Sequence, residues 1–155
     1  IKPGDHVLVS DGVYKSTRIF CDTLLARLGV KTTYFRPDIG ERIANECRPE
    51  THLVFLESPS SFTFEIQDIP SITAVCRDRG ILTAIDNTWA SPLFLKPLDH
   101  GVDISTQAAT KYLSGHADVM MGSISVRDRS RTFFCRYALA RTRASTQVSC
   151  GPRRL

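Results

Sequence analysis

Two residues of this 155-residue chain combine a reactive side chain with a position that ordinary surface residues seldom occupy. Asp86 directly follows the apolar run Ile81-Leu-Thr-Ala-Ile85, and Lys111 ends the run Ala108-Ala-Thr-Lys111. A carboxylate at the end of a buried strand must be paired or hydrated, and a desolvated lysine amine is a nucleophile toward aldehydes. Each residue also has an ordinary interpretation, because Asp-Asn-Thr favours a turn or helix cap and Lys111 could be a surface lysine at a turn.

Considered together, the two residues favour a shared chemical role. They lie 25 residues apart, and Thr110 precedes the lysine. Pyridoxal 5'-phosphate (PLP) requires a lysine that holds it as an imine and an acid that keeps its pyridine nitrogen protonated. The protonated ring withdraws electrons from a substrate α-carbanion, and a hydroxyl beside the lysine can bind the phosphate. The pattern therefore predicts a PLP site with Lys111 as the Schiff-base lysine.

The elements that must position these residues alternate between strand and helix. Short apolar or Thr-rich runs predict strands at His6–Ser10, Lys31–Phe35, Leu53–Leu56, Ile81–Ile85, Asp103–Gln107 and Met120–Val126. Helical spacing predicts helices over Tyr14–Leu28, around Ile39–Cys47 and from Asp68 to about Asp78, with Gly29 and Gly80 as terminators. This alternation predicts an α/β domain with a mainly parallel sheet. Ligands bind at the C-terminal edge of such sheets, where Asp86 is expected.

Three ordered segments carry a resemblance to a known family. They are Glu57-Ser-Pro-Ser-Ser-Phe62, Asp86-Asn-Thr-Trp-Ala-Ser-Pro92 and Asp103-Ile-Ser-Thr-Gln-Ala-Ala-Thr-Lys-Tyr-Leu-Ser-Gly-His116. They resemble successive motifs of the PLP-dependent enzymes of Cys/Met metabolism, the trans-sulfuration enzymes, and the likeness runs from about Lys2 to Val126. Within that family, the Gln-Ala-Ala-Thr-Lys run and Trp89 resemble the bacterial cystathionine β-lyases most.

The resemblance implies the large domain of fold type I, the aspartate-aminotransferase-like fold, of which residues 1–126 would form a part. It implies that Lys111 holds the cofactor and moves protons, and that Asp86 pairs with the pyridine nitrogen. Tyr14 would stack on the ring as a second catalytic residue, and Thr110 would contact the phosphate. No metal is implied.

Other motif positions have supporting roles or depart from the family pattern. His116 is expected to support the loop after Lys111, and Trp89 to pack beside the site without a chemical role. Ala108 stands where many members carry a serine as a second phosphate hydroxyl. An N-terminal Tyr and Arg, a Gly-rich phosphate turn and a C-terminal domain with a carboxylate-binding Arg complete the site in the family, and we find no counterpart of them here.

The bulk composition is that of an ordinary globular protein. Hydrophobic residues make up 42% and charged residues 23% of the chain, both near average values. The absence of any run of 18 apolar residues predicts that no segment spans a membrane. Five cysteines without a C-x-x-C pair indicate neither a zinc cage nor a disulfide framework, which favours reduced thiols and a cytoplasmic location.

Residues 127–155 form an Arg-rich tail of different character. They contain eight arginines, no lysine and one acid, Asp128, and so carry about +7 against about −3 for residues 1–126. Apart from a helix-like stretch at Thr132–Ala140, the tail has no apolar periodicity, and we interpret it as the non-native end of a frameshifted, truncated lyase. A nucleic-acid patch is the alternative. It would bind DNA in a salt-dependent way, but no reader motif supports it.

The activity implied by the resemblance is β-elimination of cystathionine to homocysteine, pyruvate and ammonia. The enzyme would be a homodimer or homotetramer that binds a small amino-acid substrate and neither nucleic acid nor membrane. Two alternatives stay open. One is a cystathionine γ-synthase or γ-lyase, which acts at Cγ, and the other is a catalytically inactive truncated fragment.

Overall fold

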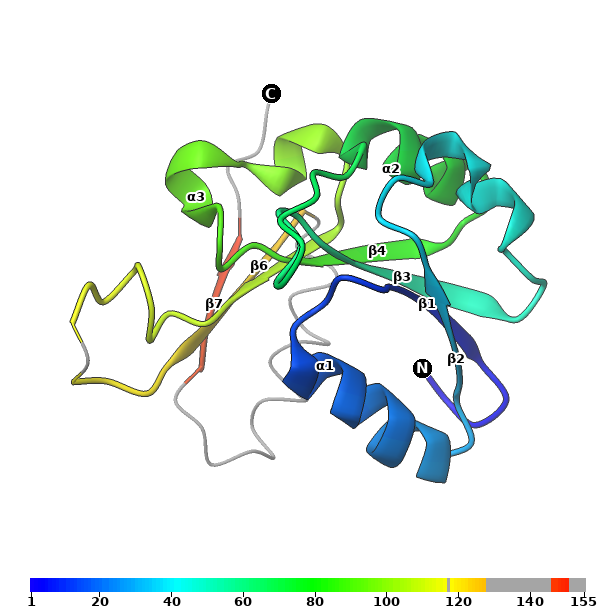
Figure 1. Ribbon diagram of the computed structural model, residues 1–155, viewed down its shortest axis with the longest axis horizontal. Helices are drawn as coiled ribbons and strands as arrows, with labels where there is room; N and C mark the ends of the chain where they lie inside the picture. Colours follow the sequence, from blue (N-terminus) through cyan, green and yellow to red (C-terminus); the bar gives the residue numbers. More distant parts are fainter. Residues whose placement is uncertain (117, 128–145, 151–155) are drawn as a thin grey trace.

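The strands predicted from the sequence assemble into one sheet in the computed structural model, which describes residues 1–116, 118–127 and 146–150 (Figure 1). The seven strands lie in the order β2-β1-β3-β4-β5-β6-β7, and every neighbouring pair is parallel except β5 and β6. Their bounds are β1 His6–Ser10, β2 Lys31–Phe35, β3 Thr51–Glu57, β4 Leu82–Asp86, β5 Ile104–Gln107, β6 Gly122–Val126 and β7 Thr146–Cys150.

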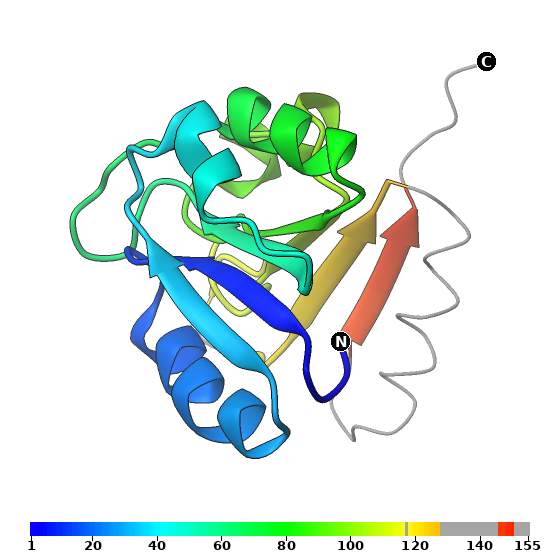
Figure 2. The same ribbon diagram turned by 90° about the vertical axis from the view of Figure 1, so that its right-hand side faces the viewer.

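Helical segments cover both faces of this sheet. Helix α1 (Lys15–Phe20) lies on one face and α2 (Ile69–Asp78) on the other, as Figures 1 and 2 show. The remaining segments are the π-helical continuation of α1, η1 (Cys21–Leu25), the 3-10 helices η2 (Gly40–Asn45) and η3 (Pro97–His100), and the short α3 (Ser91–Phe94). In the described residues, no helix is long and apolar enough to cross a membrane.

Alternation along the strands divides the hydrophobic core into two parts. In β1, Leu8 belongs to the cluster beneath α2, whereas its neighbours Val7 and Val9 belong to the cluster beneath η1, which contains Cys21. All three are at most 1% exposed. Successive side chains of a strand point to opposite faces, so a strand covered by helices on both sides must be apolar throughout. This is why the central strands read as continuous apolar runs.

The structure confirms the predicted α/β class, the mainly parallel sheet and the six predicted strands, with shifts of one or two residues at their ends. The helix predicted over Tyr14–Leu28 contains a π-helical turn in its middle, and Gly29 follows it with a φ of 76°. The helix predicted at Ile39–Cys47 is a 3-10 helix. Strand β7 was not predicted and lies within the segment interpreted as a tail. The stretch Thr132–Ala140 lies outside the described residues.

The loop after β1 and the loop after β3 approach each other closely at the sheet edge. The Ser61 amide donates a hydrogen bond to the Gly12 carbonyl oxygen at 2.8 Å. A Cβ atom built on Gly12 would lie 2.4 Å from Ser60 Oγ, and Ser60 is fully buried. Only a residue without a side chain fits between the two loops in this arrangement.

We expect Gly12→Ala to lower the free energy of unfolding by about 1–3 kcal/mol, because the added methyl group overpacks a buried contact. Gly122→Ala is the matched control, since its Cβ would meet the nearest atom, the Gln107 carbonyl oxygen, at an ordinary 3.7 Å. Urea unfolding followed by circular dichroism measures both. Equal stability of the two variants would show that the loops adjust at no cost.

Candidate active site

A cavity of about 940 Å³ opens at the C-terminal edge of the sheet. Its walls come from the ends of β3 and β4, the segment after β5 and the start of α1. The lining residues are Tyr14, Glu57, Ser61, Phe64, Asp86, Thr88, Trp89, Ala108, Thr110, Lys111, Tyr112, Gly115, His116, Asp118, Val119 and Met120. All four residues predicted as site residues, Tyr14, Asp86, Thr110 and Lys111, therefore line one cavity, although they are spread over 98 positions of the sequence.

Two carboxyl groups lie side by side at this edge. Glu57 ends β3 and Asp86 ends β4, and the two residues are partners in the parallel register. Residues in register on adjacent parallel strands point to the same face, about 4.8 Å apart. Leu56 belongs to the cluster beneath α2, so Glu57 and Asp86 point to the other face, where α1 begins with Tyr14 as its N-cap residue.

The two carboxyl groups differ in their surroundings. Asp86 is partly exposed and accepts a hydrogen bond from the Thr88 amide at 2.9 Å. Glu57 is only 6% exposed. Burial raises the pKa of Glu57 to about 7, and the charge of Asp86 adds to this, while hydrogen bonds from the Tyr14 amide and the Ser61 side chain oppose it. Sequence reasoning assigned no role to Glu57, although it ends an apolar strand in the same way as Asp86.

Lys111 lies in a turn that follows β5 and faces the cavity. The turn is closed by hydrogen bonds from the Lys111 amide to the Ala108 carbonyl at 2.9 Å and from the Gly115 amide to the Lys111 carbonyl at 3.0 Å. The Ser114 hydroxyl donates to the His116 carbonyl at 2.9 Å, so the backbone of His116 takes part in closing the loop. The sequence suggested a lysine desolvated between strands, but the side chain is exposed, because it sits beyond the strand end.

Hydroxyl groups beside the lysine are already engaged with the backbone. Thr110 Oγ1 accepts from the Met121 amide at 2.9 Å and donates to the Met121 carbonyl at 3.2 Å. Thr88 Oγ1, which the sequence analysis did not single out, accepts from the Ala108 amide at 2.7 Å. Thr110 would therefore have to release Met121 in order to donate to a phosphate.

Aromatic side chains form one wall of the cavity. The ring of Trp89 lies 5.7 Å from that of Phe64 and 6.3 Å from that of Tyr112, centroid to centroid, in tilted arrangements. Ring centroids at these distances are within the range of favourable aromatic contacts. Trp89 packs beside the site as expected, and its position makes the chain's single tryptophan a reporter of events in the cavity.

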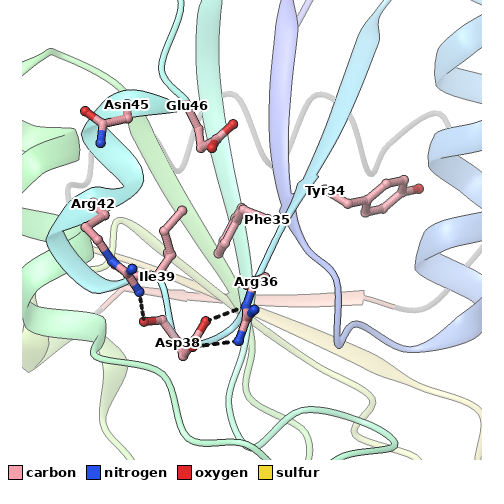
Figure 3. A pocket seen from close by; sticks show the side chains of 8 residues that line it. All are labelled: Tyr34, Phe35, Arg36, Asp38, Ile39, Arg42, Asn45 and Glu46. Carbon is pink, nitrogen blue, oxygen red and sulfur yellow. Dashed lines mark hydrogen bonds and ion pairs between the residues drawn. The ribbon is translucent and has the colours of Figure 1, made fainter.

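A second cavity, of about 450 Å³, lies beside β2 and η2 (Figure 3). Two of its arginines are bonded to Asp38. The Arg36 guanidinium makes two hydrogen bonds of 3.0 Å to the Asp38 carboxylate, and Arg42 donates to the Asp38 carbonyl at 3.3 Å. Among its described residues, this cavity contains no lysine and no cysteine, and its two arginines are both bonded to Asp38, so the candidate site is the one at the sheet edge.

Other reactive groups in the described residues do not gather into a site. No set of three or more His, Cys, Asp or Glu there could hold a metal ion. Cys21 and Cys76 are buried free thiols, and Cys47 is a half-buried one. Burial raises the pKa of Cys76 to about 12, which leaves it protonated and unreactive at neutral pH.

The groups in the sheet-edge cavity fit PLP by their chemistry. An amine, a carboxylate and an aromatic ring converge from the segment after β5, from β4 and from the start of α1. These are the groups required to hold the aldehyde, the pyridine nitrogen and the ring face of that cofactor. The fold and the cavity together have the features of a PLP-dependent enzyme of fold type I.

Comparison with known proteins agrees with this class. A family model described as Cys/Met metabolism PLP-dependent enzyme matches residues 1–142. Cystathionine beta-lyases of Escherichia coli and Haemophilus influenzae are each 47% identical over 125 residues, which is 79% of this chain and 32% of each relative. A solved cystathionine gamma-lyase from Lactobacillus plantarum, complexed with L-serine, is 36% identical with a TM-score of 0.75, over 79% of this chain and 32% of that one.

The chain therefore belongs to the Cys/Met metabolism family of PLP-dependent enzymes. It spans about a third of the length of the curated relatives it matches. The resemblance stated from the three motifs is confirmed, as are the enzyme class, the fold type and the cofactor of the family.

The raised pKa of Glu57 predicts how stability varies with pH. A carboxyl group whose pKa is higher in the folded than in the unfolded chain stabilises the fold below the unfolded value. That contribution is lost as pH rises through the folded value. Between the ordinary value of 4.5 and about 7, we expect the contribution of Glu57 to the free energy of unfolding to fall by an amount on the order of 3 kcal/mol, at about 1.4 kcal/mol per pKa unit.

Glu57→Gln removes this titration and should flatten the pH dependence over the same interval. Glu41→Gln, which changes an exposed carboxyl group on η2, is the matched control and should leave it as in wild type. Urea unfolding at half-unit steps of pH measures the effect. If the free energy of unfolding varied with pH in the same way in wild type and Glu57→Gln, the raised pKa of Glu57 would be contradicted.

Proposed function

We propose that the protein carrying this chain is a PLP-dependent carbon–sulfur lyase that acts at Cβ of cystathionine and yields homocysteine, pyruvate and ammonia. The observation that carries this proposal is the convergence of Lys111, Asp86 and Tyr14 on one cavity at the sheet edge. The beta-lyase names of the relatives at 47% identity support the choice of reaction. The substrate is an amino acid, and the enzyme works as a homo-oligomer in the cytoplasm.

Each residue has a defined task in this proposal. The Lys111 amine would hold the cofactor through its aldehyde. The same amine, when free, would take the proton from the substrate α-carbon. Asp86 would hold the pyridine nitrogen in its protonated form, and the Tyr14 ring would cover one face of the cofactor ring. PLP, when bound, supplies an electron sink for the negative charge that develops at the α-carbon. The Cβ–S bond then breaks, and its electron pair leaves on the sulfur as a thiolate.

The phosphate end of the site is less complete than the ring end. Thr110 lines the cavity but is bonded to Met121, and Ala108 offers no hydroxyl. Thr88 Oγ1 acts as an acceptor for the Ala108 amide. Within the described residues no acceptor is found for its own hydroxyl hydrogen, so Thr88 is a second candidate donor. Because the ring end of the site is present and the phosphate end is incomplete, we propose that residues 1–126 form only a part of a PLP-binding large domain.

The Schiff-base role of Lys111 is tested by trapping. We expect borohydride reduction of the chain mixed with PLP to leave a stable adduct on the peptide that contains Lys111, and Lys111→Ala to abolish it. Lys96→Ala, which removes an exposed lysine outside the cavity, is the control and should leave the adduct unchanged. Mass spectrometry of digested protein maps the site. An adduct that survives in Lys111→Ala would overturn the assignment.

The position of bond cleavage is tested by the keto acid released. Elimination at Cβ of cystathionine gives pyruvate, whereas elimination at Cγ gives 2-oxobutyrate. We expect pyruvate, measured with lactate dehydrogenase and confirmed by chromatography. A predominance of 2-oxobutyrate would favour the γ-lyase alternative, which the solved structural neighbour supports. A trapped Lys111 adduct with neither product would favour the catalytically inactive alternative.

A further inference from the structure

The ring of Tyr14 has little to hold it in place except its own backbone. The side chain is 52% exposed. Within the described part of the chain, it takes part in no side-chain hydrogen bond and no ring–ring contact. Tyr14 is the N-cap residue of α1, with φ −53° and ψ 141°, and no side-chain cap bond closes this end of the helix. The direction of the ring therefore depends on what fixes the Tyr14 backbone.

The side chain of Glu57 fixes the Tyr14 backbone. The Tyr14 amide donates a hydrogen bond of 2.8 Å to Glu57 Oε2, across 43 positions of sequence. Next to it, the Ser61 amide donates to the Gly12 carbonyl at 2.8 Å. Two hydrogen bonds thus tie the segment before α1 to the end of β3 and the loop that follows it.

Glu57 is itself held more firmly than Tyr14. It ends a strand that pairs with β1 on one side and β4 on the other, and it is buried. A buried hydrogen-bond acceptor at the end of a paired strand can therefore hold the backbone of an exposed residue in a fixed position. A carboxylate that accepts from an amide also forms a stronger bond than a neutral group does.

We propose that Glu57 is a positioning residue of the site, whose carboxyl group holds the Tyr14 backbone so that the tyrosine ring lies beside Asp86 over the cofactor position. The inference rests on the proposed function, because it is a bound cofactor that the ring position serves. Glu57 acts through Tyr14 and touches no reacting atom.

Protonation does not remove this role. Three groups act on the Glu57 carboxyl group: Asp86 on β4, Ser61 in the loop after β3 and the Tyr14 amide before α1. Burial and Asp86 raise the pKa of Glu57, while the two hydrogen bonds lower it. A protonated carboxyl group still has an acceptor oxygen for the Tyr14 amide, and so does the amide side chain of glutamine.

The first experiment measures the hydrogen bond without any cofactor. We expect Glu57→Ala to speed hydrogen exchange of the Tyr14 amide by at least about fivefold, the factor that corresponds to one lost hydrogen bond, and Glu57→Gln to keep exchange near the wild-type rate. Glu41→Gln is the control. Heteronuclear NMR or peptide-level mass spectrometry reads the amide. Equal exchange rates of the Tyr14 amide in wild type and Glu57→Ala would show that Glu57 does not hold the Tyr14 backbone.

The second experiment measures ring position with PLP present. Stacking against a fixed aromatic ring gives bound PLP a circular dichroism band, and the cofactor quenches Trp89 fluorescence when it enters the cavity. We expect Glu57→Ala to lose most of the dichroism per bound cofactor and to bind PLP about tenfold more weakly, at roughly 1.4 kcal/mol per factor of ten. Glu57→Gln should restore both.

Two further outcomes separate the possible failures. If wild type gives no borohydride-stable adduct at Lys111, the proposed function fails, and the cofactor part of the inference fails with it, whatever the amide exchange shows. If wild type forms the adduct but Glu57→Ala keeps its dichroism and affinity, only the positioning role is overturned. Should Glu57→Ala not fold, Glu57→Met keeps a similar volume without an acceptor and takes its place.

Discussion

The register between β3 and β4 is the constraint on which the site depends. Pairing of Leu53 with Leu82 at one end of the two strands brings Glu57 beside Asp86 at the other. A slip by one residue would turn every following side chain of a strand to the opposite face. It would then bury the carboxyl group of that strand beneath α2, where the apolar cluster offers no partner for a charge, and would separate it from the other carboxyl group. Burial of Val54, Leu56 and Ile85 therefore also determines where the acids emerge.

The fold could be predicted from the sequence because its signals are local. Continuous apolar runs predict buried parallel strands, and Asp68 and Gly80 mark the ends of α2. The π-helical turn at Cys21–Leu25 was missed, because the whole segment was fitted to a single α-helical period. Strand β7 was missed because its alternation of polar and small side chains is weak and its partner, β6, lies 20 residues earlier.

The candidate site was predictable where a residue with a reactive side chain lies at the end of a strand or shortly after it. Asp86 and Lys111 were found in this way, and the family resemblance added Tyr14 and Thr110. Glu57 was overlooked because its role depends on a contact with the Tyr14 amide 43 positions away, which no local pattern encodes. The bonds between Thr110 and Met121 escaped prediction for the same reason, since they depend on how the turn after β5 meets the segment before β6.

The two carboxyl groups at the sheet edge are suited to different tasks because their surroundings differ. Two acids so close together do not both ionise readily, and the buried one keeps its proton more easily. Glu57 is buried and bonded to Tyr14, whereas Asp86 is partly exposed and faces the cavity. Asp86 thus presents its carboxyl group to the cavity, where a protonated pyridine nitrogen would need it. The more buried acid is left to hold the backbone, which it can do in either protonation state.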